Sequence, residues 1–183
     1  MNYSSALEVF KAQTKNVQVL DQAIKHITRA INHALRVGDK TSAAVHTKIL
    51  ALVFSAWAEA RFSKLIHTPY GFTPDEILQI KTAHQKNGLE KGWEKCLELA
   101  LKKVPASQQS SEIPNKRKKL LEIIKEYIID LSLLRNKIAH GQWEIALNRD
   151  NDAENSLVTD KLDKLDVIAI TVWHQAYKYL EPV

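Results

Sequence analysis

Arg135 and His140 are the two residues of this chain whose types and spacing best support chemistry. They lie five positions apart within residues 133–143, where an apolar helical pattern ends. A guanidinium can hold a phosphate through two parallel hydrogen bonds, and an imidazole can accept or release a proton near neutral pH. Together they supply a phosphate anchor and an acid–base group, which are the minimum parts for cleaving RNA without a metal ion.

The reaction that these residues could perform begins at the ribose. His140, acting as a general base, takes the proton of a 2′-hydroxyl, and the resulting oxyanion attacks the adjacent phosphorus while a second proton donor assists the departing 5′-oxygen. Arg135 stabilises the charge that gathers on the phosphoryl oxygens, and Asn136 can orient His140 or the phosphate through a hydrogen bond. DNA lacks the 2′-hydroxyl and is spared.

Helical geometry separates the two groups within one chain. Five positions at about 100° each place Arg135 and His140 roughly 140° apart, and His140 points away from the apolar stripe that contains Leu134 and Ile138. Gly141 is a typical helix terminator, so the chain is expected to turn directly after the imidazole. If two copies pack about a two-fold axis at this helix end, they form a groove with two Arg and two His. In such an assembly each motif would lie opposite its twin, and the groove could hold RNA.

A structural interpretation of the same residues stays open. His140 could cap the last carbonyls of its helix, and Arg135 could bridge to Asp130 or to a neighbouring helix. Lys137 and Trp143 flank the pair and are candidate RNA contacts, although packing is an alternative for Trp143. The other candidate RNA contact is a basic run, which could instead be a solvated helix start. Its residues are Lys116, Arg117, Lys118 and Lys119.

The elements that must position the pair are helices. Apolar residues recur at spacings of three and four over residues 4–37, 89–104, 120–138 and 159–180, which predicts four amphipathic helices. Another helix, apolar on nearly all sides, is expected to start at a cap formed by Thr41 or Ser42 and to end near residue 67. Thr73 before Pro74 starts a shorter helix to about residue 86. Residues 105–114 and 148–156 are expected loops, and residues 143–147 are the one possible strand. The pattern predicts a single all-α domain, residues 1–183, built as a bundle of four or five main helices.

Composition sets the remaining limits. The chain has 183 residues, a net charge of +5 and a single cysteine, Cys96. One cysteine cannot form an internal disulfide, and the N-terminal residues lack a signal-peptide pattern, so we expect a cytoplasmic protein that does not span a membrane. The positive charge mildly favours polyanionic partners. Cys96 lies among apolar residues and is expected to be a buried, inert thiol.

No metal or cofactor site is expected. His26 and His33 lie about 10 Å apart along a helix, too far to share one ion. Glu122, Glu126 and Asp130 recur on one helix face, but the Glu-x-x-His repeats of a di-iron bundle are missing, so pairing with nearby lysines is the better interpretation.

The segment Arg135-Asn136-Lys137-Ile138-Ala139-His140 resembles the motif of the HEPN superfamily, whose hallmark is Arg, four to six residues beginning with a polar one, and then His, near the end of an all-α domain. The resemblance implies a dimeric, metal-independent endoribonuclease with Arg135 and His140 catalytic. It also implies an acidic residue near the site, for which Glu59, with Arg61 on the same predicted helix, is the candidate, and a role in toxin–antitoxin or antiphage systems with a partner such as an antitoxin. Some members only bind RNA or proteins, so a non-catalytic helical module is the alternative.

Overall fold

The computed structural model describes residues 2–105, 113–126 and 130–179, and within these ranges the chain is all-α. The bounds of the helices are α1 Tyr3–Arg36, α2 Lys40–Ile66, α3 Pro74–Asn87, α4 Leu89–Lys102, α5 Ile113–Ile124, α6 Asp130–Ala139, α7 Ser156–Asp163 and α8 Val167–Tyr179. The predicted all-α class is confirmed, and the described part of the chain holds eight helices where the sequence pattern gave four or five main ones.

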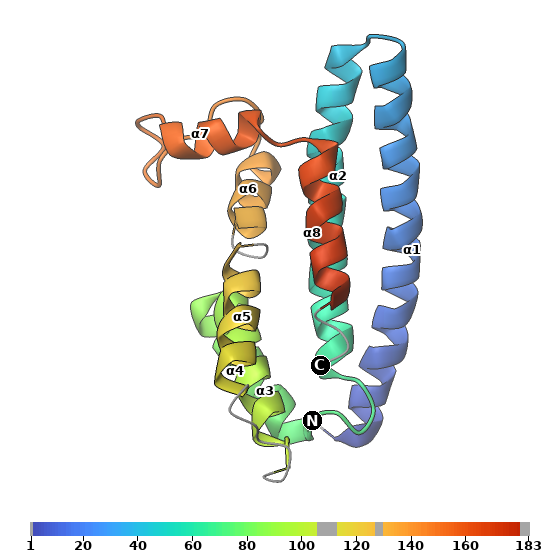
Figure 1. Ribbon diagram of the computed structural model, residues 1–183, viewed down its shortest axis with the longest axis vertical. Coiled ribbons are helices and arrows are strands. Elements are labelled where there is room, and N and C mark those ends of the chain that lie inside the picture. The colour runs from blue at the N-terminus through green and yellow to red at the C-terminus, as the bar shows by residue number, and fades with distance from the viewer. Residues whose placement is uncertain (1, 106–112, 127–129, 180–183) are drawn as a thin grey trace.

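Two long antiparallel helices, α1 and α2, form the frame of the molecule (Figure 1). Helix α2 packs against α1 on one side and against α6 and α8 on others. Ala51, Phe54 and Trp57 of α2 have no exposed surface at all. The nearly all-apolar stretch thus forms a central helix, and its middle is buried because three other helices cover it.

Aromatic rings hold α8 on this frame. Phe54 stacks on Trp57 with ring centroids 5.6 Å apart, and Tyr177 of α8 lies edge-on to both rings. The Trp57 indole nitrogen donates a hydrogen bond of 2.9 Å to Asp21 of α1. A buried indole that also satisfies its N–H contributes both packing and a hydrogen bond to the core. These contacts join α1, α2 and α8, so α2 is a fixed platform for the helix that carries Arg135.

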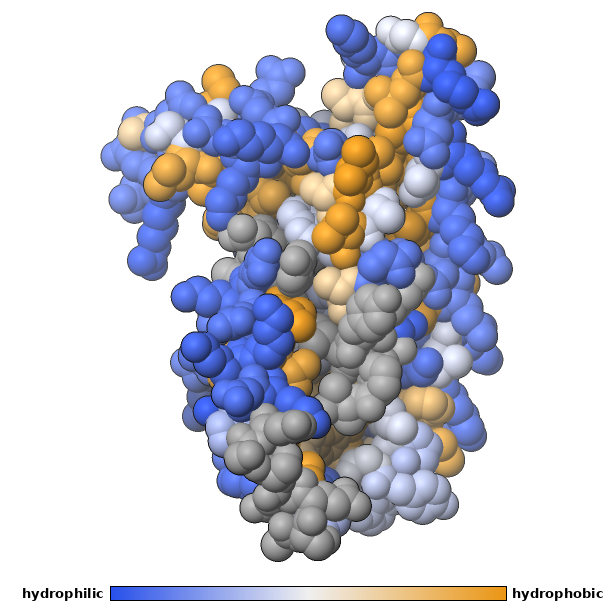
Figure 2. Space-filling view, viewed as in Figure 1, coloured by the Kyte–Doolittle hydropathy of each residue, from blue (hydrophilic) through white to orange (hydrophobic). Residues whose placement is uncertain are grey.

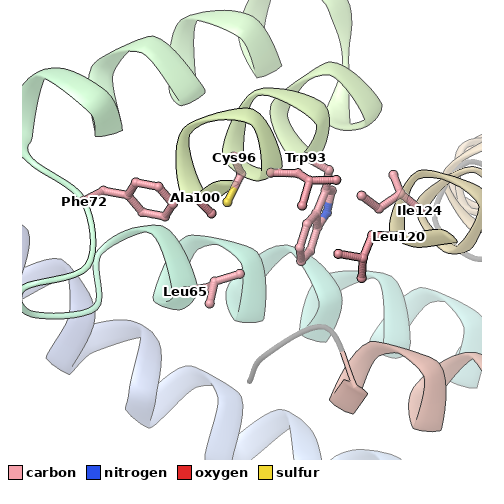
Figure 3. Close-up of a pocket in the computed structure, with 8 residues that line it drawn as sticks. Leu65, Phe72, Trp93, Cys96, Ala100, Leu120 and Ile124 are labelled. Carbon is pink, nitrogen blue, oxygen red and sulfur yellow. The ribbon is translucent and has the colours of Figure 1, made fainter. Parts of the chain in front are cut away.

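A second part of the core lies between α2, α4 and α5 (Figure 3). Cys96 and Trp93 of α4, with Leu120 and Ile124 of α5, line a small apolar cavity of 50 Å³ there. Burial raises the pKa of the Cys96 thiol to about 12, which keeps it protonated. The predicted buried location of Cys96 is confirmed.

Two predicted helix starts had different outcomes. Thr73 caps α3 as expected: its hydroxyl accepts from the Glu76 backbone, and the Glu76 side chain accepts from the Thr73 backbone. The predicted cap of α2 at Thr41 or Ser42 is wrong. Asp39 caps that helix, because its carboxylate accepts hydrogen bonds from both the backbone and the hydroxyl of Ser42.

The C-terminal part of the chain also differs from the expectation. The single helix predicted over residues 159–180 is two helices, α7 and α8, because Asp166 interrupts it and accepts a hydrogen bond of 2.7 Å from the Ala169 backbone as the first turn of α8 begins. Residues 143–147 form no strand, and only an isolated bridge joins Leu147 to Glu154. Residues 106–112 of the predicted loop and 127–129 of the predicted long helix lie outside the described residues. No described helix has the combination of length and apolar character that crossing a bilayer requires.

Candidate active site at the end of helix α6

The Arg–His motif, residues 135–140, lies at the C-terminal end of α6, beside α7 (Figure 1). Helix α6 ends at Ala139, and the His140 amide still donates to the carbonyl of Asn136 at 3.1 Å. Gly141 follows with a φ of +79°, a left-handed conformation that glycine adopts without strain. The Gln142 amide then returns to the Lys137 carbonyl at 2.9 Å. This closed turn fixes the direction in which the chain leaves the imidazole.

The Arg135 side chain reaches across to α2. Its Nε donates a hydrogen bond of 3.3 Å to the Ser55 hydroxyl, and a terminal nitrogen forms an ion pair with the Glu59 carboxylate. The side chain nevertheless keeps 36% of its surface exposed. A guanidinium has five N–H donors, so the two used here leave three for another acceptor. Arg135 is therefore held at a defined place and is still accessible.

Glu59 is the charged partner of Arg135 in this site. Burial, with a smaller contribution from the Glu59 charge, raises the pKa of the neighbouring Tyr177 hydroxyl well above its ordinary value. Tyr177 is thus neutral at physiological pH, and the negative charge of Glu59 is paired with the positive charge of Arg135. The resemblance made Glu59 a candidate, and the structure places its carboxylate on the guanidinium. Nothing in the Arg–His spacing points to Ser55, although its place one turn before Glu59 on the same face of α2 is a usable signal.

His140 is exposed, whereas Leu134 and Ile138 on the opposite face of α6 are buried. Within the described part of the chain, no group hydrogen-bonds to its ring or forms an ion pair with it. An unengaged imidazole can accept a proton from, or donate one to, an external molecule. The alternative in which its ring caps the helix carbonyls is not seen in this structure.

Asn136 shares a face with His140, because residues four apart on a helix lie one above the other. The Asn136 side chain is exposed and lines a shallow cleft with Ser132, Leu133 and the start of α4 at Leu89 and Glu90. The structure thus brings Asn136 and His140 together. It leaves Arg135 on a different side of α6, facing α2, so one chain does not gather all three residues around one point.

Lys137 and Trp143, the two flanking candidates, serve the turn after α6. The Lys137 ammonium donates a hydrogen bond of 2.5 Å to the Leu147 carbonyl, and the Trp143 indole donates one of 2.9 Å to the Ile138 carbonyl. Both side chains are half-buried. Their observed contacts are structural, and they anchor residues 141–147 against the end of α6.

The basic run from Lys116 to Lys119 lies on α5, far from the motif along the same side of the molecule. Figure 1 shows α5 below α6, with the motif at the upper end of α6 next to α7. All four side chains are exposed, and Lys119 lies 3.6 Å from Glu122 of its own helix. The structure does not bring these four residues to Arg135 or His140.

Comparisons of this chain with protein-family models, with curated proteins and with solved structures find no match. Among the described residues, no three His, Cys, Asp or Glu side chains are grouped as ligands of one metal ion. What the site can do therefore follows from its own groups: a guanidinium oriented by Ser55 and Glu59, an imidazole open to solvent, and an amide beside that imidazole.

Proposed function

We propose that this protein is a metal-independent endoribonuclease of the HEPN type. The observation that carries the proposal is that one helix end presents both an accessible guanidinium held by two acceptors and an exposed imidazole for which no partner lies among the described residues. Groups fixed in place before the substrate arrives stabilise a transition state most effectively.

The reaction proceeds by transfer within the RNA strand. His140 removes the proton of a ribose 2′-hydroxyl, a bond forms between that oxygen and phosphorus, and the bond from phosphorus to the 5′-oxygen breaks. The 5′-oxygen takes a proton from a second donor, and the products are a 2′,3′-cyclic phosphate and a 5′-hydroxyl. Arg135 uses its remaining N–H groups to hold the phosphoryl oxygens.

The catalytic unit contains two copies of the chain. Arg135 faces α2 and His140 faces solvent, so a phosphate held by the Arg135 of one copy is reached by the His140 of the other. Each site therefore needs the Arg135 of one copy and the His140 of the other, and solvent water serves as the second proton donor. This homodimer acts on RNA in the cytoplasm, in a toxin–antitoxin or antiphage setting, where a protein such as an antitoxin restrains it.

The test is cleavage of RNA by the purified protein in the presence of EDTA. Wild-type protein is expected to produce 2′,3′-cyclic phosphate ends, and His140→Ala is expected to lower the rate by about 10²- to 10⁴-fold, the usual range for losing a general acid–base group. His46→Ala, a change in a partly exposed imidazole on α2, is the control and keeps the activity. Activity that appears only with a divalent metal, or equal activity of wild type and His140→Ala, contradicts the proposal.

A non-catalytic module that binds RNA or a protein is the second candidate. The ion pair between Arg135 and Glu59 favours it, since the same contact also ties α6 to α2 as a structural bridge. Expression of the two proteins in cells separates the candidates. Growth arrest by wild type but not by His140→Ala supports the nuclease, and equal tolerance of both supports the binding module.

A further inference from the structure

The outer face of α1 is a continuous basic surface that the proposed reaction does not use. Successive residues of an α-helix are about 100° apart around its axis. With this spacing, the nine residues that form the face lie within an arc of roughly 100°. All of them are exposed, and every one is basic or carries an amide: Lys11, Lys15, Gln18, Gln22, Lys25, His26, Arg29, His33 and Arg36. We refer to them as the α1 ridge, which is about 38 Å long at 1.5 Å per residue.

The α1 ridge lies opposite the face by which α1 is packed. Val17, Ile24 and Ile31 are buried against α2, and they lie roughly 130° to 170° from the centre of the ridge. Figure 1 shows α1 as one long unbroken helix at the edge of the molecule, and Figure 2 shows hydrophilic residues along that edge. The ridge is therefore rigid and open along its whole length.

Most charges of the ridge are not neutralised. Lys11 pairs with Glu8 at 3.0 Å at the N-terminal end of α1. For Lys15, Lys25 and Arg29, no acidic side chain in the described ranges lies within ion-pair distance. A row of fixed, unpaired cations on a chain of net charge +5 attracts a polyanion.

We propose that the α1 ridge binds the phosphate backbone of double-stranded RNA. Residues 11–36 contain no Phe, Tyr or Trp, so the ridge offers no ring on which unpaired bases could stack. Lysines, arginines and amides are the groups that contact phosphate and sugar without reading sequence. A straight row of cations matches a stiff duplex better than a flexible single strand. Only the choice of RNA as the polymer rests on the proposed function.

The same features argue against a membrane and against a second copy of the chain as the occupant. A helix that lies on a bilayer inserts its apolar face into the lipid, and the apolar face of α1 is already buried against α2. A second copy would place like charges opposite one another along the ridge. The duplex is the occupant that leaves α1 packed as it is and supplies the opposite charge.

The experiment measures binding of an RNA duplex of about 20 base pairs, longer than the roughly 16 that a double-stranded-RNA-binding domain spans, by fluorescence anisotropy. All proteins carry His140→Ala, so that cleavage cannot interfere. The ridge variant adds Lys15→Gln, Lys25→Gln and Arg29→Gln. The control variant adds Lys86→Gln, Arg149→Gln and Lys164→Gln, which are exposed cations on other surfaces and lower the net charge equally.

The ridge variant is expected to bind the RNA duplex at least about tenfold more weakly than the parent. Between 50 and 200 mM salt, the slope of log K against log salt concentration, where K is the association constant, is expected to be shallower by roughly two to three units. The control variant is expected to stay within about twofold of the parent, as suits surface cations that touch no phosphate. Circular dichroism melts are used to check that both variants are folded. Equal weakening by both variants, or unchanged binding by the ridge variant, overturns the proposal.

Two further measurements test the other occupants. If the parent protein binds vesicles of phosphatidylserine and phosphatidylcholine but not the duplex, or if the ridge variant changes the oligomeric state of the chain without changing duplex binding, the proposal is overturned.

The failures of the two proposals are distinguishable. A wild-type protein that does not cut RNA but needs the ridge for duplex binding refutes only the nuclease, and one that cuts RNA but binds the duplex without the ridge refutes only this inference.

Discussion

At the scale of single residues, Arg135 is defined by what holds it. Ser55 and Glu59 lie one turn apart on α2 and engage different nitrogens of the same guanidinium, so its plane as well as its position is fixed. A lysine at this position has one nitrogen on a flexible stem and cannot contact both acceptors while also holding a phosphate through two bonds.

Arg135→Lys therefore tests whether geometry or charge alone matters. Because the positive charge is kept while the planar fork is lost, we expect RNA cleavage to fall by about 10²-fold, with folding nearly unchanged. The measurement is single-turnover cleavage together with urea unfolding. Lys64→Arg, which alters a cation elsewhere on α2, is the control. Full activity of Arg135→Lys would show that a point charge is enough and would remove the role assigned to Ser55 and Glu59.

The sequence predicted part of this site. Periodicity fixes which side of a helix is apolar, so the exposure of His140 followed from Leu134 and Ile138. The contact of Arg135 with Ser55 joins residues 80 positions apart, and spacing within one helix carries no information about such a partner. The packing alternative for Trp143 is the one observed, whereas nothing in the sequence pattern indicated that Lys137 bonds the Leu147 carbonyl.

At the scale of elements, the start of a helix could be predicted where two local sequence signals coincided. The start of α3 was predictable because Thr73 precedes both a first-turn proline and Glu76. The break between α7 and α8 was not, because the apolar spacing continues through Leu165 and no Gly or Pro marks it. Asp166 was the only sign, and a lone capping residue inside a periodic stretch is a weak signal.

The start of α3 also gives a pH dependence. Burial raises the pKa of Glu76, but hydrogen bonds from Lys103 and Thr73 outweigh this effect and hold the pKa below its ordinary value of 4.5. A carboxylate whose pKa is lowered by folding stabilises the protein above the unfolded pKa, and this stability is lost as the pH falls through the folded pKa.

Glu76→Gln should therefore lower the free energy of unfolding at neutral pH by about 0.5 to 1 kcal/mol, the usual contribution of a partly exposed pair, and have a smaller effect at an acidic pH well below 4.5. Urea unfolding at both pH values measures this difference. Glu90→Gln, in the first turn of α4 and without an ion pair among the described residues, is the control. An equal effect of Glu76→Gln at both pH values would show that the ion pair with Lys103 contributes nothing.

At the scale of the whole molecule, α2 separates the two surfaces proposed to meet RNA. Figure 1 places α1 and α6 on opposite sides of α2, which packs against both. A single chain therefore presents the α1 ridge and the Arg–His motif in different directions. The all-α bundle could be predicted from periodicity, but this arrangement could not, because helices of equal amphipathicity can pack in several orders around one central helix.

The composite catalytic unit predicts complementation between two inactive variants. If Arg135 of one copy acts with His140 of the other, a dimer of Arg135→Ala with His140→Ala keeps one site in which both residues are intact. Mixing equal amounts makes half of the dimers mixed, each with one of two sites, so about a quarter of wild-type activity should return after subunit exchange. The measurement is RNA cleavage before and after the mixture is incubated long enough to exchange, with light scattering to follow the dimer. A mixture that stays inactive although mixed dimers form would place both residues of a working site in one chain, and helix geometry then requires α6 to unwind before Arg135 and His140 can converge.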